Sequence, residues 1–147
     1  MKKYKLVNTF LKVGKIIAIV LIPVFALLFI VFTIIGSLNV TGAIAAHQSD
    51  EEIALQVAAL VSWIVDFLTL TVLSILSLVF NGVASKGVIA ASSKAEIKKP
   101  AIFAIVSGAC ITLFGIPAGI IALTMKDEDF AEVNAEKPVD VKPAEDK

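Results

Sequence analysis

The stretch that decides the fold is IIAIVLIPVFALLFIVFTIIGSLNVTGAIAA, residues Ile16–Ala46, which contains no charged side chain. Two further stretches, Ile53–Ser85 and Pro100–Met125, have the same character, and Asp66 is the one charged residue in all three. A membrane-crossing helix needs about 20 mostly apolar residues to pass a hydrocarbon layer roughly 30 Å thick. Each stretch is long enough, and a chain of 147 residues with a mean hydropathy of +0.92 has too little polar sequence to cover them in water. These stretches predict an integral membrane protein.

The overall composition supports that interpretation and limits the classes of partner that we expect. Hydrophobic residues make up 58% of the chain, above the roughly 45–50% that is typical of soluble domains. Thirteen lysines balance thirteen acids, so the net charge of zero provides no basic domain for nucleic acid. We therefore expect the lipid bilayer as a partner, together with a second copy of the chain or another membrane protein, and no nucleic acid.

The fold class expected is all-α, an integral membrane three-helix bundle with spans at about 16–40, 52–81 and 100–125. Residues 1–15 place apolar side chains on one helical face and lysines on the other, which predicts a basic amphipathic segment along the cytoplasmic interface. A plain orienting signal without an ordered helix is the alternative. Residues 16–125 form the transmembrane domain, and residues 126–147, rich in Glu, Asp, Lys, Pro and Ala, predict a disordered charged tail.

The distribution of lysines predicts how the chain is threaded. The first loop, His47–Glu52, holds three acids and no lysine, whereas lysines precede the first span and the third. The positive-inside rule therefore places the N-terminus in the cytoplasm of a multi-pass plasma-membrane protein, and three crossings put the C-terminal tail outside. A secretory signal cleaved after Ala45 is the alternative, but its apolar core would be longer than the usual 7–15 or so residues. The lysines expected to meet lipid headgroups are Lys2, Lys3, Lys5, Lys12, Lys15, Lys98 and Lys99.

Local signals suggest where the helices begin and end. Ser49 followed by Glu52 is a capping box that would open the second helix, and the acids of this loop favour the positive end of the helix dipole. A calcium site is the alternative for these acids, although adjacent carboxylates lack the alternating spacing of a calcium loop. Asn81 with Gly82 is a plausible stop for the second helix. Pro100 suits the first turn of the third helix, where its missing N–H costs nothing.

Asp66 is the main candidate for a polar site inside the membrane. A carboxyl near the middle of a span costs about 2.5–3.5 kcal/mol on insertion scales, so we expect it to be neutral and to have a role. Helical spacing groups Ser62, Thr69 and, further along, Ser77 with Asp66. In one interpretation this stripe hydrogen-bonds a neighbouring helix. In the other, Asp66 exchanges a proton or coordinates a cation along a polar path.

The third stretch predicts a helix-packing face. Small residues recur in it at offsets of three and four, and Gly115 with Gly119 forms a GxxxG motif. Such faces let helix backbones approach closely where lipid removes the hydrophobic incentive for association. Pro23 and Pro117 each remove a helical hydrogen bond, so we expect kinks there. The residues of the predicted face are Ala101, Ala104, Gly108, Thr112, Gly115, Gly119 and Ala122.

No enzymatic constellation is recognised in the chain, and no cofactor or metal site is expected. His47 is the sole histidine and Cys110 the sole cysteine, so neither a metal set nor an intrachain disulfide is expected. The glycines lie in apolar helices rather than in phosphate-binding loops. The function expected is that of a structural or accessory membrane component that assembles through helix packing. An oligomeric channel, a holin-like pore or a proton-coupled carrier using Asp66 is the alternative.

Overall fold

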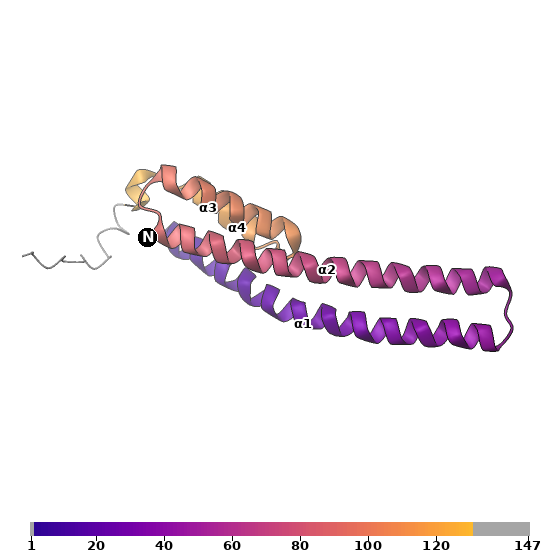
Figure 1. Cartoon of the computed structure of the whole chain (residues 1–147). Coiled ribbons are helices and arrows are strands. Elements are labelled where there is room, and N and C mark those ends of the chain that lie inside the picture. Colours follow the sequence, from indigo (N-terminus) through magenta and orange to yellow (C-terminus); the bar gives the residue numbers. More distant parts are fainter. Residues whose placement is uncertain (1, 131–147) are drawn as a thin grey trace, which may run out of the picture.

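The computed structural model describes residues 2–130, and in this part of the chain it is helical without any strand. Two long helices, α1 (Lys2–Ala45) and α2 (Asp50–Ala90), are followed by α3 (Lys94–Ser107), the short π-helix η1 (Gly108–Thr112) and α4 (Gly115–Leu123). Figure 1 shows α1 and α2 as a long pair, with α3 and α4 packed against the half that holds the N-terminus. The all-α prediction is confirmed, whereas the single third span is replaced by two short helices.

The turn between α1 and α2 forms as its sequence predicts. The Ser49 hydroxyl accepts the Glu52 backbone N–H at 3.3 Å, and the Glu52 carboxylate accepts the Ser49 N–H at 3.1 Å. Both halves of the predicted capping box are therefore present, and three acids occupy the first turn of α2. The capping box is confirmed because it depends only on residues three positions apart.

Along most of its length the α1–α2 pair has no other helix beside it. At about 1.5 Å per residue, the 44 residues of α1 extend roughly 66 Å. A Cβ on Gly36 would lie 2.6 Å from Leu60 Cδ1, so the missing side chain allows the two helices to approach closely here. The outer surface remains apolar, with Leu38 66% and Leu55 72% exposed. Both helices are long and apolar enough to cross a membrane, by length and composition.

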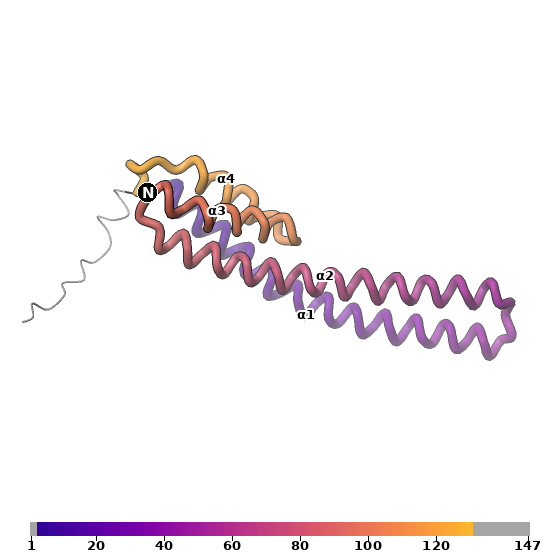
Figure 2. Tube along the Cα trace, turned by 45° about the horizontal axis from the view of Figure 1, so that its top comes forward, coloured from indigo at the N-terminus to yellow at the C-terminus, as the bar shows by residue number. Residues whose placement is uncertain are grey.

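The third apolar stretch folds back on itself, which corrects the expectation of a span at 100–125. Figure 2 shows α3 and α4 running side by side in opposite directions from a tight turn near the middle of α2. The turn consists of η1 followed by Leu113, whose φ of 53° lies in the left-handed region. Because α3 begins at Lys94 with Ser93 as its N-cap, Pro100 lies inside the helix rather than in its first turn. Pro117 lies in the first turn of α4, where it interrupts no helix interior.

Asn81 and Gly82 do not end the second helix, which continues to Ala90. The continuation is stabilised by burial, because Ala84 and Val88 are fully enclosed by the neighbouring helices. The turn signal of an Asn-Gly pair is local and weak, and tertiary packing overrides it here. The second span predicted at 52–81 is therefore the outer part of a longer helix.

The N-terminal segment is the first part of α1 rather than a separate interfacial helix. Its apolar face packs inward, since Val7 and Leu11 are buried in the core cluster. The beginning of the predicted disordered tail is also ordered, because residues 127–130 are helical and Phe130 is 1% exposed. Residues 131–147 of that prediction lie outside the described residues. The larger side chains of this core are Val7, Leu11, Val88, Ile97, Met125 and Phe130.

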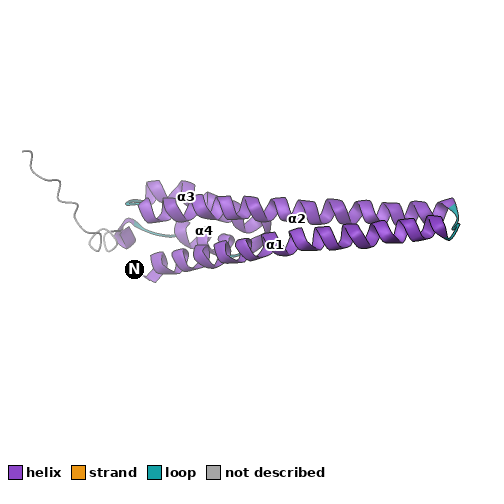
Figure 3. Cartoon of the chain, turned by 60° about the horizontal axis from the view of Figure 1, so that its bottom comes forward, coloured by secondary structure: helices purple, strands orange, loops and turns teal. Residues whose placement is uncertain are grey.

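Both ends of the described chain meet at one end of the molecule. The Lys3 ammonium lies 3.3 Å from Asp129 Oδ2, and the Lys94 N–H donates to Asp127 Oδ1 at 3.1 Å. Figure 3 shows the α1–α2 loop at the opposite end, far from the N-terminus and from the α2–α3 connection. A bundle of three crossings would separate Lys3 from Asp129 by the whole length of a span. That expectation is therefore wrong for the described chain.

Candidate functional site

Asp66 lies on the outer face of α2, about midway along the apolar length of the pair. The rings of its neighbours Trp63 and Phe67 pack on Phe32 of α1, with centroids 5.2 and 5.1 Å from the Phe32 centroid. These contacts place Asp66 beside the part of α1 around Phe32. Asp66 itself is exposed, as are Ser62 and Thr69. Among the described residues, no side chain or backbone group forms a hydrogen bond or ion pair with the Asp66 carboxyl. The structure thus brings Ser62, Asp66 and Thr69 together on an exposed surface of α2.

Ser77 does not belong to that outer face, although helical spacing grouped it with Asp66. It is fully buried, and its hydroxyl donates to the Ser107 carbonyl at 3.0 Å. The Ser107 hydroxyl donates back to the Ser77 carbonyl at 2.9 Å, and Thr112 Oγ1 lies 3.3 Å from Ser77 Oγ. This reciprocal pair joins α2 to the end of α3. Sequence reasoning missed Ser107, because only the fold of the third stretch places it opposite Ser77.

Asn81 extends this buried polar cluster without completing it. Its side chain is fully buried, and neither its Nδ2 nor its Oδ1 has a hydrogen-bond partner. A Cβ on Gly14 would lie 3.1 Å from Asn81 Nδ2, so the amide is pressed against the backbone of α1. A buried amide without partners costs about 1–3 kcal/mol. Asn81 is therefore a point of weakness where α1, α2 and η1 meet.

Replacing Asn81 with leucine should stabilise the protein or leave its stability unchanged. Leucine has the same branched shape and removes the unpartnered amide, so we expect up to about 1–3 kcal/mol of stabilisation. The matched control is Ser77→Ala, which removes formed hydrogen bonds and should destabilise by about 1 kcal/mol. Thermal unfolding in detergent measures both changes. A large loss of stability in Asn81→Leu would show that the amide has a bound partner such as a buried water.

The small residues of the predicted packing face are all buried, but they do not form one face of one helix. Those of α3 face those of α4 across the hairpin. A Cβ on Gly119 would lie 2.5 Å from the Ala101 carbonyl oxygen, and one on Gly115 would collide with the Ala104 carbonyl oxygen. These positions let α3 and α4 approach within the same chain. The buried set comprises Ala101, Ala104, Gly108, Thr112, Gly115, Gly119 and Ala122.

The lysines expected to meet lipid headgroups lie in the part of the molecule where both ends of the described chain meet. Lys5, Lys12 and Lys15 are exposed along the first turns of α1, and Lys98 and Lys99 are exposed near the start of α3. The structure describes the backbone of Lys2 in α1 but not its side chain. The opposite end carries the acids of the α1–α2 turn. The described part of the chain is thus electrically asymmetric along its long axis.

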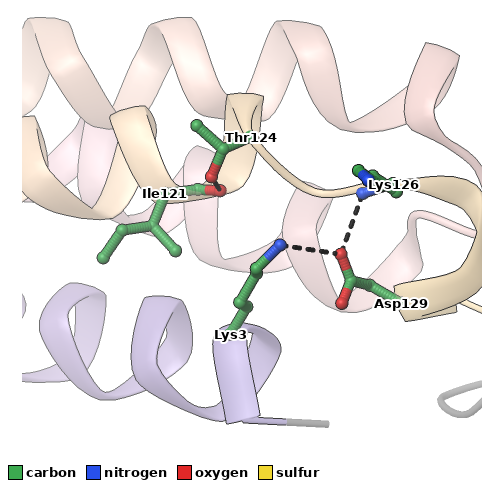
Figure 4. A network of polar contacts seen from close by, with 5 residues as sticks. All are labelled: Lys3, Ile121, Thr124, Lys126 and Asp129. Carbon is green, nitrogen blue, oxygen red and sulfur yellow. Dashed lines mark hydrogen bonds and ion pairs between the residues drawn. The ribbon is translucent and has the colours of Figure 1, made fainter.

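Lys3 also takes part in the contact that holds the end of the described chain. Figure 4 shows its ammonium and the Lys126 backbone N–H converging on the same Asp129 oxygen, at 3.3 and 2.9 Å. The Lys126 N–H, followed by the Lys3 charge, holds the pKa of the Asp129 carboxyl below its usual value. The contact therefore favours the ionised form of the Asp129 carboxyl. Separately, burial raises the pKa of the Tyr4 phenol.

The Asp129 contact should make stability depend on pH in the acidic range. A carboxylate whose pKa is lowered by folding stabilises the folded state above its ordinary pKa, and this contribution is lost as the pH falls through the lower folded value. The melting temperature should therefore drop as the pH is lowered from about 5 to about 2. The asparagine side chain of Asp129→Asn cannot ionise, so the melting temperature of this variant should drop less over the same pH range. Identical titrations of the two proteins would contradict this role of Asp129.

No protein-family model, curated protein or solved structure matches this chain. Among residues 2–130, no group of three His, Cys, Asp or Glu side chains is placed to hold a metal ion. The candidate features for a function are the outer face around Asp66 and the lysine-rich end of the described chain. The buried serine cluster and the small-residue contacts are internal to the fold.

Proposed function

We propose that this chain is a small plasma-membrane protein in which α1 and α2 cross the bilayer as a hairpin. The support is the apolar surface that both helices leave exposed over their outer halves. A hydrocarbon layer of about 30 Å requires roughly 20 residues of each helix, and Ile16–Leu38 with the facing part of α2 meets that requirement. The α3–α4 hairpin then lies at the inner side. Its tip, with Leu113 68% exposed, reaches the inner leaflet.

The charge asymmetry supports an orientation with the lysine-rich end in the cytoplasm. The positive-inside rule weighs lysines close to the ends of spans, and the described lysines lie at one end while the α1–α2 turn carries acids. In this arrangement the N-terminus and the start of the tail are both cytoplasmic. This replaces the expected outside tail, because the chain crosses twice rather than three times.

Within the membrane, the proposed role is that of a structural or accessory component that assembles through the outer face of α2. The observation that carries this proposal is the exposed Asp66 at mid-depth, which has no partner among residues 2–130, with Ser62 and Thr69 on the same face. In lipid such a carboxyl costs about 2.5–3.5 kcal/mol on insertion scales. A neighbouring helix that supplies a hydrogen bond lowers this cost, so the face favours association over isolation.

The test is to compare the size of the native assembly when the carboxyl is removed. In mild detergent, the unaltered protein should migrate on a native gel as a complex larger than one chain, and Asp66→Leu should shift it toward the single chain. Asp50→Asn is the matched control, because it removes an acid from the α1–α2 turn and should leave the complex intact. The proposed role is wrong if Asp66→Leu leaves the complex unchanged.

An oligomeric channel or a proton-coupled carrier is the second candidate. The observation that favours it is that one carboxyl and two hydroxyls share a face, so several copies could enclose them in a common polar interior. Purified protein in liposomes under an imposed pH gradient distinguishes the two roles. Flux that is lost in Asp66→Asn supports the channel or carrier, because asparagine cannot change its charge. Absence of flux supports the accessory role.

A further inference from the structure

We propose that the partner on the outer face of α2 is a second copy of this chain, packed in parallel so that the two Asp66 carboxyls meet. This inference rests on the proposed membrane location and on assembly through Asp66, and it names the partner. The face is continuous in the structure, because its residues are all exposed and follow one another at helical spacing. Its members are Leu55, Ala58, Ala59, Ser62, Asp66 and Thr69.

The shape of this face allows a second helix to come close. Ala58 and Ser62 precede Asp66 at intervals of four residues, which is the small-xxx-small spacing that supports close helix pairs in lipid. The residues of α2 that contact α1 are Leu60, Trp63 and Phe67, which lie about 60–120° around the helix from Asp66, so the Asp66 face adjoins the α1 contact and remains exposed. The α3–α4 hairpin reaches α2 only from about Ser77 onward, as the serine pair shows. Figure 2 shows the outer half of α2 free of other helices except α1.

The chemistry of the face matches a copy of itself. A neutral carboxyl carries one O–H donor and one acceptor oxygen, so two such groups facing each other satisfy both. Ser62 and Thr69 lie one turn to either side of Asp66, and their hydroxyls can donate to or accept from the facing carboxyl. A lysine from a different protein would also complement an ionised Asp66. Such a partner would have to place its charge at the same mid-membrane depth.

Two copies of this chain that cross the membrane in the same orientation have their Asp66 side chains at the same depth. The lysine-rich ends direct every copy the same way across the bilayer, so two chains are parallel. In a two-fold symmetric pair of parallel helices, the same residue of each chain lies at the same level, and the residues on the axis meet their own equivalents. Asp66 therefore meets Asp66 without any further adjustment of register.

Cysteine cross-linking tests this pair directly. The sole native thiol is first removed with Cys110→Ser, and cysteines are then introduced as Ser62→Cys or Leu68→Cys in full-length protein in its membrane. Ser62 lies on the proposed interface, whereas exposed Leu68 lies about 9 Å further along α2, within the same apolar part, and about a third of a turn around the helix. Oxidation should convert Ser62→Cys to a disulfide-linked pair and leave Leu68→Cys mostly single. Two differently tagged copies identify the pair as two copies of this chain.

Substitutions at Asp66 then test the carboxyl contact. Asp66→Leu added to Ser62→Cys should lower the cross-linked fraction by about threefold to tenfold, the range expected for membrane hydrogen bonds. Asp66→Asn should retain most of it, because the amide is also both donor and acceptor. Equal cross-linking at positions 62 and 68, or none at either, would overturn the pair.

One further outcome separates this inference from the proposed function. If Ser62→Cys cross-links to a different protein and never to the second tagged copy, the second-copy inference fails while assembly through the Asp66 face stands. If, in addition, Asp66→Leu leaves the complex on the native gel unchanged, the proposed function fails as well. Cross-linking therefore tests the identity of the partner, and the native gel tests whether the Asp66 face assembles at all.

Discussion

Gly115→Ala should strongly destabilise the α3–α4 hairpin. An added Cβ at this position would collide with the Ala104 carbonyl oxygen and lie 2.6 Å from the Gly108 nitrogen. Both obstacles are backbone atoms, which cannot rotate away as a side chain can. Overpacking typically costs about 1–3 kcal/mol and sometimes more, and we expect the effect here at or above the upper end of that range.

The matched control is the same substitution at Gly82. Gly82 lies inside α2, and a Cβ there would meet nothing within 4 Å. Alanine is favoured over glycine in a helix interior by roughly 0.5–1 kcal/mol, so Gly82→Ala should be neutral or stabilising. The two variants add the same methyl group with opposite expected signs, which separates local clash from any general effect of losing a glycine.

The reaction of Cys110 with a thiol dye during heating measures both variants. Cys110 is half-buried within η1, next to the contact between Gly108 and Gly115, and it is the sole thiol of the chain. Gly115→Ala should lower the temperature at which this thiol reacts, and Gly82→Ala should leave it equal or higher. If Gly115→Ala melted like the unaltered protein, α3 and α4 would not pack as closely as described.

The features that the sequence predicts correctly are those set by nearby residues. The Ser49–Glu52 capping box forms because both partners lie within one turn. The helical nature of the first two apolar stretches follows from their length and composition. The shared face of Ser62, Asp66 and Thr69 follows from helical periodicity alone. That this face points outward depends on where α1 packs, and periodicity carries no information about that.

The third stretch shows where such reasoning fails. An apolar run of this length can cross a membrane once or fold into two short helices, and its small residues recur at helical offsets in either case. The break occurs at Leu113, which has a φ of 53° although leucine rarely adopts this conformation. Glycine or asparagine would have marked such a turn. The hydrogen bonds between Ser77 and Ser107 and the burial of Phe130 both depend on the α3–α4 hairpin. They could not be predicted because the hairpin was not predicted.

If only α1 and α2 cross the membrane, the start of the tail lies on the same side of the membrane as the N-terminus. Two single-cysteine proteins in the Cys110→Ser background test this: Ala46→Cys in the outer turn and Glu128→Cys at the end of the described chain. Both positions are exposed. A thiol reagent that cannot cross membranes should label Ala46→Cys in intact cells and should label Glu128→Cys only after the membrane is opened.

The expected contrast is all or none, because the two cysteines would be separated by the whole bilayer. Labelling of Glu128→Cys in intact cells would restore three crossings and would require the Lys3–Asp129 contact to be absent in the membrane. The charge of Lys126 argues against that outcome. In a three-span arrangement Lys126 would lie at the outer membrane edge, against the positive-inside rule. With two crossings it joins the other lysines on the cytoplasmic side, in agreement with the positive-inside rule.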